Sequence, residues 1–66
     1  MPLVEGERRD LLEALEDAWE EWQAAQNFFS EAADPDLVDQ AIFRLEAAER
    51  RYDYLWKLFR QKYKGE

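Results

Sequence analysis

Three acidic side chains, Glu13, Asp17 and Glu20, are the residues whose type and spacing come nearest to a chemical site in this 66-residue chain. On a helix they would share one face, and grouped carboxylates can bind a metal ion. Di-iron sites in helical bundles, however, use Glu-x-x-His pairs that project inward, and this chain has no His and no Cys. The three acids also fall on outer positions of the heptad pattern. We therefore interpret them as a solvated face and predict no metal site.

Groups for nucleophilic or acid–base catalysis are also scarce. The chain has a single Ser, Ser30, no Thr, and only two glycines, Gly6 and Gly65. It therefore lacks a nucleophile with an adjacent base and a glycine-rich phosphate loop. Paired carboxylates act as acid and base in a cleft that excludes water, which a thin helical protein does not build. We predict a protein that is not an enzyme, with no catalytic residue and no cofactor.

Two hydrophobic stripes indicate the elements that carry these side chains. Each stripe steps by four and three residues in alternation, which is the heptad spacing that turns one seam of a helix towards a partner helix. The first stripe contains Leu11, Leu15, Ala18, Trp22, Ala25, Phe29 and Ala32, and the second contains Val38, Ala41, Leu45, Ala48, Tyr52, Leu55 and Phe59. We call these two stripes together the seam.

The dipeptide Asp34-Pro35 separates the stripes and predicts a tight turn, because Asp is a good helix N-cap and Pro suits the first helical position. Folding the chain back there brings large residues opposite small ones, as in Trp22 to Ala48. We predict an all-α fold in a single domain over residues 1–66: an antiparallel two-helix hairpin, similar to a coiled coil, with helices over about 7–33 and 35–64.

The two flanks of the seam differ in character. On the flank of heptad g positions, Glu21 faces Arg51 and Phe28 can receive Arg44, so this side is closed by an ion pair and a cation–π contact. On the flank of e positions, apolar side chains alternate with two polar ones. This second set, which we call the aromatic strip, comprises Leu12, Trp19, Gln26, Ile42, Glu49, Trp56 and Tyr63.

The aromatic strip is interpreted as an interface with a second copy, which would convert two hairpins into a four-helix bundle. A core in a domain below about 70 to 80 residues rarely supplies more than about 3 to 5 kcal/mol, and a chain without Cys has no disulfide to compensate. Large aromatic side chains near the centre of a patch are the usual anchors of such contacts. Two alternatives stay open: Trp19 and Trp56 fold down over the seam, or the strip binds a helix of another protein.

Two further sets of residues on the second helix could make contacts. A secondary patch on its outer face consists of Phe43, Ala47 and Tyr54. The basic end of the same helix offers an alternative function, contact with nucleic acid, through Arg50, Lys57, Arg60, Lys62 and Lys64. We disfavour nucleic acid as a partner because cations near a helix C-terminus stabilise the helix without any ligand.

The charge distribution supports the hairpin and limits the partners. Residues 1–35 carry ten acidic and two basic side chains, residues 36–66 carry six acidic and seven basic, and the whole chain has a net charge of −7. An antiparallel pair lays the basic end of the second helix beside the acidic first helix. Such an acidic protein is repelled by nucleic acid and anionic lipid. With no apolar run near the ~20 residues of a membrane span, we expect no membrane association and a cytoplasmic protein.

A short pattern in the second helix carries a family resemblance. Ala48 is followed by Tyr52, Tyr54 and Leu55, and Trp19 lies upstream. Over roughly residues 10–60 the chain resembles the YaaL-like family of small bacterial proteins of unknown function. The resemblance implies a cytoplasmic protein of Gram-positive-type, often spore-forming bacteria, whose genes tend to lie near recombination-repair and sporulation genes. It implies no activity and no functional residues.

Overall fold

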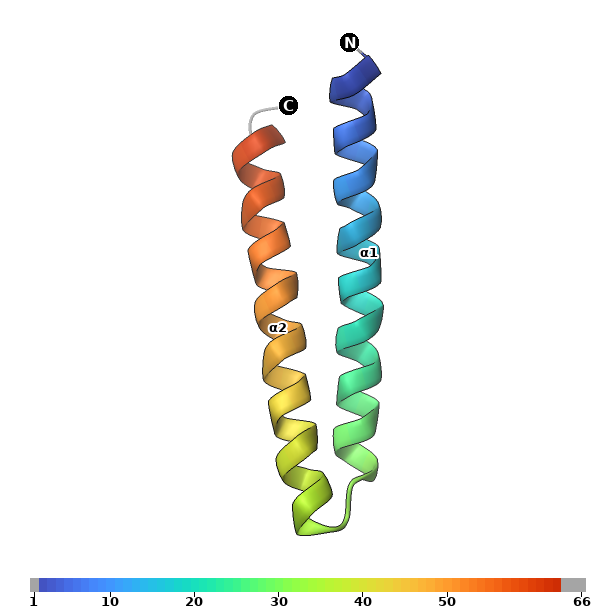
Figure 1. The fold of residues 1–66 in the computed structure, drawn as a ribbon, viewed down its shortest axis with the longest axis vertical. Coiled ribbons are helices and arrows are strands. Elements are labelled where there is room, and N and C mark those ends of the chain that lie inside the picture. The colour runs from blue at the N-terminus through green and yellow to red at the C-terminus, as the bar shows by residue number, and fades with distance from the viewer. Residues whose placement is uncertain (1, 64–66) are drawn as a thin grey trace.

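The fold is an antiparallel pair of long helices (Figure 1). The structure, a computed structural model, describes the backbone of residues 2–63 and the side chains of residues 6–63. Helix α1 runs over Pro2–Glu31 and helix α2 over Pro35–Tyr63, with no strand among these residues. The two helices lie side by side along their length, so that the turn is at one end of the rod and the beginning of α1 and the end of α2 are at the other. The molecule measures 51 × 16 × 14 Å.

The turn between the helices is closed by the side chain of Asp34, as its sequence predicts. The Asp34 Oδ1 atom accepts a hydrogen bond of 3.1 Å from the backbone N–H of Asp36. The Asp34 carbonyl accepts the first bond of α2, 2.8 Å from the Val38 N–H. Pro35 occupies the first helical position, where its missing N–H leaves no bond unmade. Asp34 is therefore the N-cap of α2.

The ends of α1 differ from the expected range of about 7–33. The helix begins at Pro2 because proline is tolerated in the first turn, where the backbone N–H groups have no partner within the helix. Gly6 does not interrupt it, since one glycine costs only about 1 kcal/mol in a helix interior. The helix ends at Glu31, although the Ala32 N–H still donates 3.1 Å to the Phe28 carbonyl. Lys64, the expected end of α2, lies outside the described residues.

The seam forms the contact between the helices. All five buried residues within 6–63 belong to it, and four of them are alanines: Leu15, Ala18, Ala25, Ala41 and Ala48. The other seam residues are half-buried, except Phe29 near the turn, which is exposed. No large side chain among the described residues is fully buried. The hairpin is therefore held by a thin core in which small residues let the helices approach closely.

A row of aromatic rings continues from this core towards the open end of the hairpin. Trp22 stacks on Tyr52 with ring centroids 5.7 Å apart, and the row continues edge-on through Trp56 to Phe59. Tyr63 ends the row, with its ring tilted by 45° to that of Phe59. The facing heptad positions place Trp22 opposite Ala48. Its ring reaches Tyr52, one turn further along α2. The Trp22 indole Nε1 is buried with no hydrogen-bond partner in the described part of the chain.

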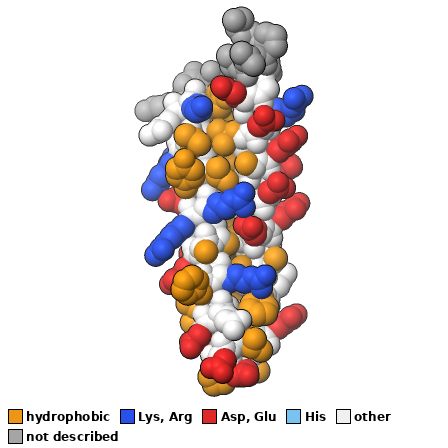
Figure 2. Space-filling view, in the orientation of Figure 1, with side chains coloured by type: hydrophobic (Ala, Val, Ile, Leu, Met, Phe, Trp, Pro, Cys, Tyr) orange, Lys and Arg blue, Asp and Glu red, His pale blue; other side chains and the backbone are white. Residues whose placement is uncertain are grey.

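The flank of g positions is closed as the sequence predicts. The Arg51 guanidinium donates to the Glu21 carboxylate at 2.9 Å, and the Arg44 guanidinium lies 5.0 Å from the centre of the Phe28 ring. Both predicted contacts are confirmed. In Figure 2 acidic side chains gather along α1 and basic ones along α2, with apolar side chains between them. Opposite charge on the two helices thus accompanies the antiparallel pairing.

Candidate interaction surface

The aromatic strip lies on the other flank of the seam, and most of it is open to solvent. Trp19 is 47% exposed, and Leu12, Ile42 and Trp56 are each 41% exposed. Gln26 and Glu49 are exposed as well, and Tyr63 is half-buried. Both helices run without interruption, so residues seven apart recur on the same side about every 10 Å. The structure therefore presents the predicted strip as an apolar surface with two polar positions.

The two tryptophans of the strip are held differently. Trp56 is packed edge-on between Tyr52 and Phe59, with centroid distances of 6.4 and 5.9 Å and interplanar angles of 86°. It partly covers the seam, as one of the alternative interpretations expects, and yet 41% of it remains exposed. Trp19 is the more exposed of the two and lies near the middle of α1. Trp19 is accordingly the residue best placed to anchor a contact.

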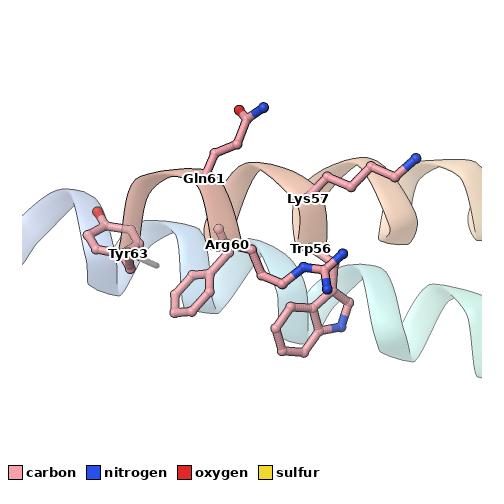
Figure 3. Close-up of a pocket in the computed structure, with 6 residues that line it drawn as sticks. Trp56, Lys57, Arg60, Gln61 and Tyr63 are labelled. Atoms are coloured by element: carbon pink, nitrogen blue, oxygen red, sulfur yellow. The ribbon is translucent and has the colours of Figure 1, made fainter. Parts of the chain in front are cut away.

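A groove opens beside Trp56 at the open end of the hairpin (Figure 3). Its volume is about 500 Å³, and it is lined by Trp56, Lys57, Phe59, Arg60, Gln61 and Tyr63. A second hollow of about 430 Å³, lined by Tyr52, Asp53, Trp56 and Arg60, shares two residues with it. In Figure 3 Trp56, Arg60 and Tyr63 lie towards α1, whereas Lys57 and Gln61 point away from it. The strip is therefore hollowed and apolar at its open end, with cations on its edge.

Sequence reasoning missed this groove, and of its six lining residues it assigned only Trp56 and Tyr63 to the strip. Phe59 belongs to the seam pattern, and Arg60 looked like a helix-end cation, so neither was assigned to the strip. The available signal was the spacing of Tyr52, Trp56, Phe59 and Tyr63, which places four rings on adjacent turns of one helix side. Arg8 completes the row, since its guanidinium lies 6.0 Å from the Phe59 ring centre and 5.9 Å from that of Tyr63.

The secondary patch is strongly exposed at its two aromatic residues. Phe43 is 78% exposed and Tyr54 is 62% exposed, the two largest values among the exposed large hydrophobic side chains. Ala47 instead lines a depression of about 380 Å³ on the g flank, together with Arg44 and Arg51. All three residues of the patch are exposed, and Ala47 lies between the patch and the g flank.

The basic residues suggested for nucleic acid do not all lie on one side of α2. Lys57 forms an ion pair of 3.0 Å with Asp53, one turn earlier. Arg60 borders the groove beside Trp56, whereas Lys62 lines a depression on the g flank with the acids Glu7 and Asp10. Arg50 is exposed, and Lys64 lies outside the described residues. Lys62 thus lies apart from Lys57 and Arg60, which border the same groove.

Metal chemistry and membrane insertion find no support among the described residues. No group of three or more Asp, Glu, His or Cys side chains within residues 6–63 is arranged to hold a metal ion. Glu13, Asp17 and Glu20 are exposed along α1, as expected of a solvated face. Neither helix, over the part that the structure describes, has the apolar length that crossing a membrane requires.

Comparison with known proteins places the chain in a family. Residues 3–63 match the model of a family described as protein of unknown function, DUF2508. The chain belongs to the DUF2508 family. The YaaL-like family, which the sequence resembles, is also a family of unknown function. The match is consistent with that resemblance but does not carry the YaaL name. No curated protein and no solved structure matched this DUF2508 protein significantly.

Proposed function

We propose that this DUF2508 protein is a non-enzymatic interaction module that binds a second copy of itself through the aromatic strip. The observation that carries the proposal is the exposure of four large apolar side chains on one flank: Leu12, Trp19, Ile42 and Trp56. The opposite flank is closed by the Arg51–Glu21 ion pair. Apolar patches rimmed by polar residues are typical of interaction sites, and aromatic residues are the usual anchors.

The thin core supports the same proposal. Since four of the five buried residues in the described part of the chain are alanines, a single hairpin buries little apolar area there. A second hairpin laid on the strip would cover Trp19 and Trp56 and add a layer of large side chains to the core, giving a four-helix bundle. The resulting dimer would serve as a scaffold, and the resemblance to YaaL-like proteins supports a cytoplasmic setting. A helix of another protein is the alternative occupant of the strip.

Contact with nucleic acid has weaker support. The ion pair of Lys57 with Asp53 and the net charge of −7 both oppose it. Binding of this kind would weaken steeply with added salt, whereas contact through an apolar strip would not. Measuring binding to single-stranded and double-stranded DNA between low and physiological salt separates the two functions.

The mass in solution, measured by light scattering behind a sizing column over a wide concentration range, tests the self-association. We expect twice the 8.0 kDa of one chain at high concentration and a return to one chain for Trp19→Ala. Phe43→Ala is the matched control, because it removes an aromatic side chain that is 78% exposed but lies off the strip. It should keep the mass of the wild type.

If Trp19→Ala unfolds the chain, Ile42→Glu provides the second variant, since Ile42 is 41% exposed and a charge is tolerated there in a single hairpin. A wild-type protein with the mass of one chain at every concentration would refute the proposal. So would a folded Trp19→Ala variant that associates as tightly as the wild type.

A further inference from the structure

Charge is distributed unevenly along the long axis of the hairpin. The turn end, residues 24–43, carries four acidic side chains and no basic one: Glu31, Asp34, Asp36 and Asp39. The open end, residues 6–14 and 56–63, carries three acidic side chains and five basic ones: Arg8, Arg9, Lys57, Arg60 and Lys62. All nine of these residues named at the two ends are exposed. The rod of 51 Å thus has a negative end and a positive end.

This polarity distinguishes the two ways in which a second copy can cover the aromatic strip with two-fold symmetry. In a parallel dimer, with both turns at the same end, the acidic turn ends of the two copies lie side by side, and so do their basic open ends. With the turns at opposite ends, each negative end lies beside a positive end. We infer that the second copy lies antiparallel on the strip, the turn of each hairpin beside the open end of the other. The inference rests on the self-association proposed above.

The spacing along α2 gives the register of this dimer. Arg60 lies 11 residues after Glu49 and Asp39 lies 10 residues before it, or about 16 and 15 Å along the helix. Both lie at the edge of the strip, Arg60 one turn after Trp56 and Asp39 one turn before Ile42. A two-fold axis at the level of Glu49 therefore brings Arg60 of each copy to the level of Asp39 of the other.

The parallel arrangement lacks these pairs between Arg60 and Asp39. It would instead bring Arg60 of each copy to the level of Arg9 of the other, a like-charge contact made twice. The antiparallel arrangement has its own unfavourable contacts, since two Glu49 side chains approach the axis and Asp53 approaches Glu46. The charge of Asp53 is already offset by Lys57 at 3.0 Å. The balance of these contacts favours the antiparallel dimer.

A distance between two spin labels tests the orientation directly. The chain contains no Cys, so Ala33→Cys places a single label on the exposed link between the helices. Ala33 follows the end of α1 at Glu31, which lies 12 residues beyond Trp19, and it is therefore about 20 Å from the level of the axis. We expect the two labels about 40 Å apart in an antiparallel dimer, against less than about 20 Å for neighbouring turns in a parallel one.

Charge exchange tests the register. Arg60→Asp and Asp39→Arg should each weaken dimerisation by about three- to tenfold, and the variant with both changes should recover wild-type dimerisation. Arg50→Asp is the matched control, because it makes the same change of charge at an exposed residue away from the strip and should leave dimerisation within about twofold.

The outcomes separate this inference from the proposal on which it rests. A dimer with the long label distance and recovery in the exchanged variant would support both. A dimer with the short distance, or with no recovery, would overturn the antiparallel inference and leave the self-association standing. A labelled protein with the mass of one chain at every concentration would overturn both.

Discussion

Replacement of Leu15 by Ala tests whether the thin seam holds the hairpin together. Leu15 is the only large side chain among the buried described residues, with 7% of its surface exposed. Leu to Ala in a protein core costs about 2 to 5 kcal/mol, and we expect the lower end, about 2 to 3 kcal/mol, because two helices can close partly over the lost volume. That is about half of the 3 to 5 kcal/mol that a core of this size supplies.

Thermal denaturation, followed by circular dichroism at one protein concentration, measures this loss. At roughly 4 to 8 °C per kcal/mol for a small domain, the melting temperature should fall by about 10 to 20 °C. Leu37→Ala is the matched control, because Leu37 is 40% exposed, lies off both the seam and the strip, and should lose less than about 1 kcal/mol. Equal losses for Leu15→Ala and Leu37→Ala would refute the assignment of the seam as the core.

Two further predictions concern the turn and the closed flank. Asp34→Ala should destabilise the fold by about 1 kcal/mol in thermal unfolding, because the Asp36 N–H loses its acceptor at 3.1 Å. Asp34→Asn, which keeps an acceptor, should stay near the wild type. Equal effects of both changes would exclude the role of Asp34 as the N-cap. A double-mutant cycle with Glu21→Gln and Arg51→Gln should give a coupling of about 0.2 to 1 kcal/mol that decreases in 1 M salt, since both side chains are about half exposed. A coupling unchanged by salt would show that the ion pair is not its source.

The hairpin itself could be read from the sequence because its determinants are local or periodic. The spacing of Leu15, Ala18, Trp22 and Ala25 depends only on helix geometry, and the N-cap at Asp34 depends only on its near neighbours. The pairing of Glu21 with Arg51 followed from the same periodicity once the chain folds back at the turn. The heptad positions also predicted which side of the seam would be left open.

The tertiary structure decided what depends on side-chain conformation and on the approach of the two helices. Heptad positions place Trp22 opposite Ala48, but the ring rotates onto Tyr52, because a large flat side chain reaches beyond its own layer. Arg8 lies over Phe59 and Tyr63, a contact between chain segments about fifty residues apart that no local pattern indicates. The groove beside Trp56 results from these ring orientations.

The sequence by itself thus determined two helices, their direction, the turn and the surface that stays uncovered, because helix periodicity and capping act over a few residues. Only the tertiary structure decided how the aromatic rings pack and where the cations at the end of α2 lie, with Arg60 at the groove and Lys62 on the opposite flank. Rotation about side-chain bonds is chosen by the neighbours that the folded chain supplies, and those neighbours come from the other helix.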